Sequence, residues 1–142
     1  MALLSDEIVA ELREVFAGLK EPVRLAVFSQ ALEDPISEEV GRLVEELAAL
    51  DQKLTAEPRN FVLDQERVSE LGIERTPAIA ILGAEKDYGV RFYGAPAGYE
   101  FGSLVEAILD VSSGESGLAE ATRTALAGLE RDLRVRVFST PT

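Results

Sequence analysis

Residues Asp34, Pro35, Ile36 and Ser37 stand where a strand is expected to end and a helix to begin. The run before them, residues 23–28, is apolar enough for a buried strand. Apolar side chains recur at helical spacing after them, at Val40, Leu43, Val44, Leu47 and Leu50. Free backbone N–H groups at a helix N-terminus favour negative charge, so a strand that leads into a helix is a frequent place for chemistry.

The residue types in the chain restrict that chemistry, because there is no Cys and no His. Dithiol exchange, thiolate nucleophiles and thiolate or imidazole metal ligands are excluded within this chain. Histidine acid–base catalysis and Ser-His-Asp triads are excluded as well. Carboxylates, hydroxyls, Tyr, Lys and Arg remain, and no residue among them is assigned a catalytic or metal-binding role. No cofactor is expected.

The four residues at positions 34–37 suit the start of a helix. Asp34 is a good N-cap, and Pro35 fits the first helical position, where its missing N–H costs nothing. An alternative interpretation is that the acidic cluster of Glu33, Asp34, Glu38 and Glu39 binds Ca²⁺ or Mg²⁺. The cluster lacks the fixed loop spacing of a strong calcium site, so the sequence favours the capping role.

Composition and charge limit the class of protein. The 142 residues are 46% hydrophobic and 28% charged, which is an ordinary globular balance. The net charge of −12 repels phosphate backbones and anionic lipid, so no binding to nucleic acid or to a membrane is expected. No apolar run is long enough to span a bilayer, and the N-terminus does not look like a signal peptide. We therefore expect a cytoplasmic protein.

Apolar periodicity and turn residues predict an α/β fold. Strands that alternate with helices favour a parallel sheet, and two adjacent strands near residue 85 add an antiparallel part. The predicted elements are a helix that begins after Ser5 and ends near Gly18, a strand at 23–28, a helix to Leu50, a strand at 57–63, a helix at 65–71, strands at 78–82 and 89–93, a helix around 101–109, a helix at 119–129 and a strand at 133–138.

An internal repeat divides the chain. Residues 17–29 and 127–139 align without a gap at an offset of 110, with 7 of 13 positions identical. Two helix–strand junctions of similar composition could match by chance, but the order of helix, turn and strand is kept throughout. The repeat predicts one complete unit at 1–112, a linker at 113–117, and the first helix and strand of a truncated second unit at 118–142.

Several motifs give the first unit a family resemblance. They run in order along the chain: Val27-Phe28, Leu43-Val44-Glu45-Glu46-Leu47, Arg75-Thr76-Pro77-Ala78, the run from Lys86 to Gly94, the run Pro96-Ala97-Gly98-Tyr99-Glu100-Phe101, and Ile108-Leu109-Asp110-Val111-Ser112. In these residues the chain resembles the N-terminal unit of the glutaredoxin-like, two-unit protein disulfide oxidoreductases. The resemblance implies a thioredoxin-like fold with a central mixed four-stranded sheet flanked by helices.

The resemblance also implies what the opening segment has replaced. In that family the first unit carries Cys-x-x-Cys at the start of its second helix, and those cysteines fall on Asp34 and Ser37. Asp34, Pro35, Ile36 and Ser37 are then a degenerate redox motif that cannot exchange disulfides. The resemblance further implies that the second unit places a Cys-Pro-x-Cys directly after a segment like residues 140–142.

A second implied site lies at Arg75, Thr76 and Pro77. In thioredoxin-like folds this proline is cis and lies beside the redox motif, and the residue before it offers its backbone to an extended peptide. We therefore expect a cis bond between Thr76 and Pro77, and a peptide groove at these three residues. The alternative is that Pro77 only shapes the turn into the strand at 78–82.

Two functions follow as hypotheses. The first is a redox-inactive unit of a disulfide-oxidoreductase-like protein, whose second unit acts on protein or peptide thiols and disulfides. The chain alone is then no enzyme, although its full-length relative is one. The alternative is a stand-alone peptide- or protein-binding module that uses the groove at Pro77. An enzyme that works with carboxylates alone has no support in the spacing. The segment 133–138 is expected to pair with a sheet edge, either in this chain or in a homodimer, and the alternative is a disordered tail.

Overall fold

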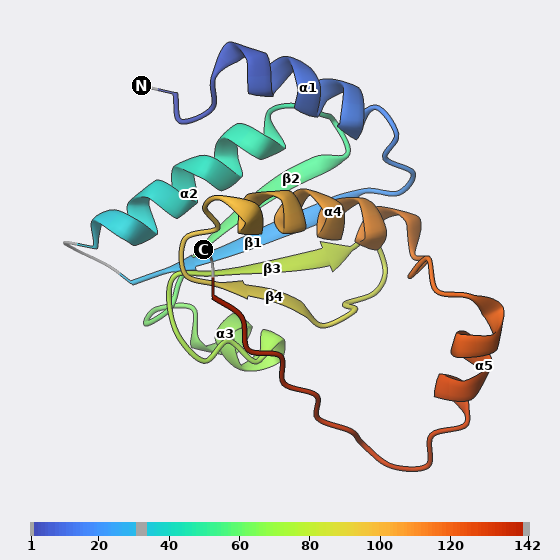
Figure 1. Cartoon of the computed structure of the whole chain (residues 1–142). Helices are drawn as coiled ribbons and strands as arrows, with labels where there is room; N and C mark the ends of the chain where they lie inside the picture. Colours follow the sequence, from blue (N-terminus) through green and yellow to red (C-terminus); the bar gives the residue numbers. More distant parts are fainter. Residues whose placement is uncertain (1, 31–33, 141–142) are drawn as a thin grey trace.

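The computed structural model describes residues 2–30 and 34–140 (Figure 1). Helices and strands alternate along most of its length, as the apolar periodicity predicts. In chain order they are α1 (Asp6–Phe16), β1 (Val23–Ser29), α2 (Pro35–Ala48), β2 (Leu54–Asn60), α3 (Gln65–Leu71), β3 (Ala78–Gly83), β4 (Val90–Tyr93), α4 (Tyr99–Ser113) and α5 (Glu120–Ala127).

The four strands form one mixed sheet in the order β2-β1-β3-β4. Strand β1 runs parallel to β2 and antiparallel to β3, and β3 and β4 form an antiparallel hairpin. Val23 is opposite Leu54 on one side and Gly83 on the other, and Phe28 is opposite Ala78. The predicted α/β class and the mixed four-stranded sheet are thus confirmed.

Side chains of β1 alternate between two hydrophobic clusters because successive residues of a strand point to opposite faces. Val23, Leu25 and Val27 belong to the larger cluster, which contains the buried hydrophobic residues of α1, α2 and α4. Ala26 and Phe28 belong to the smaller cluster, which α3 covers. Figure 1 shows the same arrangement, with α3 lying apart from the other helices that pack on the sheet.

Strand β2 differs from its prediction. It was expected at 57–63 and lies at Leu54–Asn60, because the chain turns at Asn60. The side chain of Asn60 accepts hydrogen bonds from the N–H groups of Val62 and Leu63, both at 2.9 Å, so these residues belong to a turn. Pro58 is tolerated within the strand because β2 is an edge strand of the sheet.

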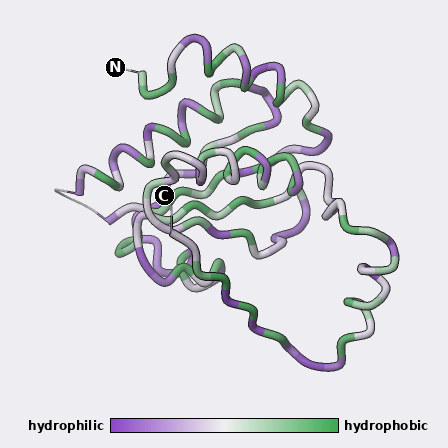
Figure 2. The backbone as a smooth tube through the Cα atoms, viewed as in Figure 1, coloured by the Kyte–Doolittle hydropathy of each residue, from purple (hydrophilic) through white to green (hydrophobic). Residues whose placement is uncertain are grey.

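The predicted strand at 133–138 is wrong for this structure. Residues 128–140 form no helix or strand, and every residue from 115 to 140 is exposed. Figure 2 shows hydrophobic and hydrophilic stretches alternating along this tail, which extends from α5. The alternation is typical of a strand, but a strand also needs a neighbouring strand to bond its backbone groups, and residues 133–138 pair with none of the four described strands.

Among the described residues, no helix is both long and apolar enough to cross a bilayer.

Ser112 joins the end of α4 to the beginning of β1. It is buried, with 2% of its surface exposed. Its hydroxyl donates to the carbonyl oxygen of Glu21 at 2.7 Å and accepts from the N–H groups of Lys20 and Glu21 at 2.9 and 3.1 Å. One side chain therefore satisfies three backbone groups of the loop that leads into the central strand.

The substitution Ser112→Ala removes the hydroxyl that bonds those three backbone groups, and Glu21 N keeps its bond to the carbonyl oxygen of residue 112 at 3.3 Å. Loss of a buried hydroxyl that bonds such groups typically lowers the free energy of unfolding by about 2 kcal/mol. We expect this loss in urea unfolding followed by circular dichroism. The neighbouring substitution Ser113→Ala is the matched control, and a loss there as large as that of Ser112→Ala would contradict the assignment.

Candidate functional site

Asp34 caps helix α2, and its carboxylate faces the free N–H groups of the first turn. Oδ1 accepts from Ile36 N at 3.2 Å and from Ser37 N at 3.3 Å. The Ser37 hydroxyl donates to Oδ2 of the same carboxylate. Pro35 occupies the start of the helix, where no N–H is needed. The capping role predicted for these residues is present in the structure.

Hydrogen bonds control the charge of this cap. The Ser37 hydroxyl and the Ser37 N–H hold the pKa of the Asp34 carboxyl below its ordinary value of 3.8, and Ile36 N–H adds to the effect. Ser37 is buried, with 2% of its surface exposed, whereas Ile36 is 52% exposed. Asp34 is therefore an anion at neutral pH, and the hydroxyl of Ser37 is used in a hydrogen bond to it. Nothing in this pair is arranged to accept or transfer a proton at neutral pH.

The peptide bond between Thr76 and Pro77 is cis, which is the isomer that the resemblance implied. Pro77 is buried, Thr76 is half-buried and Arg75 is exposed. The carbonyl oxygen of Pro77 accepts from Gly94 N at 2.9 Å. The guanidinium carbon of Arg75 lies 4.3 Å from the centroid of the Tyr93 ring, a cation–π contact that orients this side chain.

The sheet brings the two predicted sites to the same end of the molecule. Phe28, near the end of β1, is the register partner of Ala78, the first residue of β3. The chain that leads to Asp34 therefore leaves the sheet beside the point at which Pro77 enters it. Figure 1 shows the start of α2 and the start of β3 at one end of the sheet. This is the relation that the resemblance implied.

The cation-binding alternative has no support in the described residues. Glu33 lies outside them, and Glu38 and Glu39 are exposed on α2. In the part of the chain that the structure describes, no group of three or more acidic side chains is placed to hold a metal ion.

One feature was missed by the sequence reasoning, an apolar groove that we call the α1–α2 groove. It has a volume of about 320 Å³ and is lined by Leu3, Leu4, Ile8, Glu39, Val40, Leu43, Phe101 and residues 95–98. Leu4 precedes the N-cap Ser5, and an apolar residue there often packs back onto the helix that follows. That signal could have indicated that Leu3 and Leu4 are ordered against the body of the protein.

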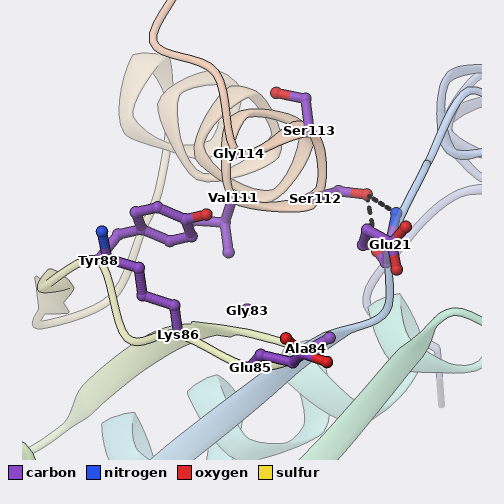
Figure 3. Close-up of a pocket in the computed structure, with 10 residues that line it drawn as sticks. All are labelled: Glu21, Gly83, Ala84, Glu85, Lys86, Tyr88, Val111, Ser112, Ser113 and Gly114. Atoms are coloured by element: carbon purple, nitrogen blue, oxygen red, sulfur yellow. Dashed lines mark hydrogen bonds between the residues drawn. The ribbon is translucent and has the colours of Figure 1, made fainter.

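A second cavity, of about 390 Å³, lies at the opposite end of the sheet from Asp34 (Figure 3). Gly83, at the end of β3, and Gly114, at the end of α4, help to line it. The Ser112 hydroxyl at its edge is already used by the loop before β1. Lys86 lies over the ring of Tyr88, with its nitrogen 5.0 Å from the centroid. The Ser112 bonds join the end of α4 to the loop before β1, and the Lys86–Tyr88 contact lies within the connection between β3 and β4.

The chain was compared with known proteins to find those that it resembles. No family model matches the chain. Over 110 residues, or 78% of the chain, it is 34% identical to an NADH dehydrogenase of Ferdinandcohnia aciditolerans, of which it covers 18%. It is 29% identical over 105 residues to an alkyl hydroperoxide reductase component of Staphylococcus epidermidis, again covering 18% of that protein.

Solved structures agree with these relatives. The NTD_N/C domain of the alkyl hydroperoxide reductase AhpF of Enterococcus faecalis superimposes with a TM-score of 0.79 at 30% identity, over 90% of this chain and 62% of that one. A protein disulfide oxidoreductase of Aeropyrum pernix K1 gives 0.79 at 34% identity, over 91% and 56%. The chain spans about a fifth of the curated relatives and less than two thirds of these solved chains.

The resemblance stated from the sequence is therefore confirmed. The chain is a thioredoxin-fold unit of the kind found in the AhpF N-terminal domain and in protein disulfide oxidoreductase. The chain contains no cysteine.

The Asp34 cap generates a prediction about pH. Because its pKa is lowered on folding, ionised Asp34 stabilises the protein above the unfolded pKa near 3.8, and this contribution is lost as the pH falls through the folded pKa. The substitution Asp34→Asn keeps a capping oxygen but cannot ionise. We expect the unfolding midpoint of the parent to exceed that of Asp34→Asn at pH 6, and the difference to shrink as acid is added towards pH 2.5. A difference that does not change with pH would contradict the assignment.

Proposed function

We propose that this chain, a thioredoxin-fold unit without cysteine, is a redox-inactive unit of a protein-disulfide-oxidoreductase-like (glutaredoxin-like) protein. Thiol–disulfide exchange would reside in a second thioredoxin-like unit that begins at about residue 118. The observation that carries the proposal is the cap at Asp34. The motif position is occupied by an ionised carboxylate and a buried hydroxyl bonded to each other, while the sheet, the helix and the cis-proline around it are kept.

The tail supports the second half of the proposal. In the first copy of the repeat Leu19 and Val27 are buried, at 5% and 3% exposure, and so is Phe16 just before it, at 0%. The offset of 110 residues matches them to Leu126, Leu129 and Val137, which are 50%, 49% and 86% exposed. The tail therefore repeats an apolar pattern that the first unit buries, and it does so without a core to bury it.

One position of the repeat shows how the second sheet would differ. Arg136 aligns with Ala26, which is fully buried in the smaller cluster beneath α3. A guanidinium at that position needs a carboxylate partner or water. We infer that the second sheet is more polar than the first on this face.

The partners follow from the same proposal. They are the second unit, which would provide neighbouring strands for residues 133–138, and the protein or peptide thiols and disulfides on which the whole protein acts. A second copy of the chain could provide those neighbouring strands instead, and a homodimer through 133–138 would result.

The alternative function is a binding module that acts without redox chemistry at Arg75, Thr76 and Pro77. The observation in its favour is that Arg75 is exposed yet held on the ring of Tyr93, beside the start of β3. A peptide that bound there would meet an oriented cation next to Thr76 and Pro77. Amide shifts confined to residues 75–78 on addition of unfolded peptides would favour this function.

Restoring the thiols tests the assignment of the degenerate motif. We expect the double substitution Asp34→Cys and Ser37→Cys to form a disulfide and to accelerate the reduction of insulin by dithiothreitol by about tenfold, because the helix N-terminus stabilises a thiolate. The pair Ser5→Cys and Ile8→Cys is the matched control, since Ser5 caps α1 as Asp34 caps α2 but lies at the start of a different helix. Equal rates for the two variants would contradict a redox-motif position at 34–37.

The mass of the native protein tests the second unit. We expect the protein isolated from its own cells to have an intact mass at least twice the 15.4 kDa of this chain. We also expect its additional residues to contain a Cys-x-x-Cys that reacts with Ellman's reagent after reduction. An intact mass of 15.4 kDa would contradict the second unit and would favour the binding module.

A further inference from the structure

We propose that the α1–α2 groove is a binding site for an extended, positively charged polypeptide segment, which inserts an apolar side chain between α1, α2 and residues 95–98. The site is separate from Arg75, Thr76 and Pro77. The proposal does not depend on whether a second unit carries a dithiol.

The groove has an apolar floor and partly exposed apolar walls. Val40 at the floor is buried, and Leu43 and Phe101 are half-buried. Leu3 and Ile8 form a wall, and they remain 37% and 39% exposed. With about 320 Å³ of space, the groove is large enough to take an aliphatic or aromatic side chain.

The carboxylate of Glu46 holds one wall in place. Its two oxygens accept from Leu3 N at 2.7 Å and from Leu4 N at 3.0 Å. These hydrogen bonds also lower the pKa of Glu46, and the bond from Leu3 has the largest effect. The carboxylate is therefore ionised at neutral pH. The N-terminal segment is thereby attached to α2 across more than forty residues of sequence, and the groove exists before any partner arrives.

Apolar surface continues beyond the groove along α2. Ile36, Val40 and Leu43 are spaced by four and three residues and therefore lie on one face of the helix. Ile36 is 52% exposed, and Tyr99, next to the lining residue Gly98, is 89% exposed. A partner can thus contact apolar side chains on both sides of the groove, which suits an extended segment better than a compact small molecule.

Charge indicates which segment fits. The three stretches that contain the lining residues, 2–8, 35–46 and 95–101, carry seven acidic residues and one basic residue, Arg42, and the charged residue in the lining itself is the acidic Glu39. A segment with Lys or Arg on either side of its apolar residue would be attracted, and an acidic one would be repelled. The same field disfavours the acidic body of a second copy as the occupant.

An NMR titration of the 15N-labelled chain tests the site. The probe is the peptide acetyl-Arg-Leu-Phe-Arg-amide, and the control peptides are acetyl-Glu-Leu-Phe-Glu-amide and acetyl-Arg-Ser-Ser-Arg-amide. We expect saturable shifts at the amides of Val40, Leu43, Ala97 and Gly98 with the probe, and much smaller shifts with either control. No saturable shift at these amides, or equal binding of the acidic peptide, would overturn the proposal.

Two substitutions sharpen the test. Glu39→Lys reverses an exposed charge on the groove, and we expect it to weaken binding of the probe by about fivefold at low salt. Glu106→Lys makes the same change on α4 outside the groove, and we expect less than about a twofold effect. Ile8→Ser removes part of the wall and should weaken binding without altering the circular dichroism spectrum. Equal effects of Glu39→Lys and Glu106→Lys would overturn the proposed site.

Two further outcomes would assign the groove differently, and each overturns the proposal. Shifts confined to residues 75–78 would place peptide binding at Pro77, in favour of the binding module. Shifts at Val40 and Ala97 that grow with the concentration of the protein alone would show that a second copy occupies the groove.

Discussion

Strand β1 is the constraint on which the rest of the fold depends. It is bonded on both edges, parallel to β2 and antiparallel to β3, and it packs against a hydrophobic cluster on each face. Val23, Leu25 and Phe28 are fully buried as a result. The end of this strand determines where α2 begins and where β3 begins, so the two candidate sites at Asp34 and Pro77 share one end of the sheet. The sheet alone therefore brings the two sites near each other, and no direct contact between Asp34 and Pro77 is needed for this.

The same helix terminus can serve two kinds of chemistry. Unpaired N–H groups and the helix dipole stabilise negative charge, whether it is carried by a carboxylate or by a thiolate. Asp34 uses this environment as a cap, and Ser37 is committed to Asp34. On the proposed function, Asp and Ser stand where the resemblance places thiols, which would remove redox chemistry while the local structure stays favourable. The unit would then have kept its fold without its reaction.

Local signals in the sequence were sufficient for most elements. Helix α3 lies at the predicted residues because Gly72 ends it in a left-handed conformation, with φ of 63°. Strand β2 lies earlier in the sequence than predicted. Its limits depend on pairing with β1 and on the turn at Asn60, which composition alone does not show. In the tail, the sequence pattern predicted a strand that the structure does not have. Residues 133–138 have the apolar alternation of a strand but pair with none of the described strands. The α1–α2 groove was missed because three segments that are distant in the sequence form it, and two of them are joined by a hydrogen bond from Leu3 N to Glu46.

The bonds of Ser112 have a mechanical consequence. They anchor the end of α4 to the start of β1, and Gly114 then takes a left-handed conformation, with φ of 70°, at the first residue beyond the helix. Residues 115–117 are exposed and include a second left-handed glycine, Gly117. Rotation in this short segment leaves the bonds of the central strand unchanged. On the proposed function, a second unit attached beyond this segment would change its orientation by rotation there, and the hydrogen bonds of the sheet would be kept.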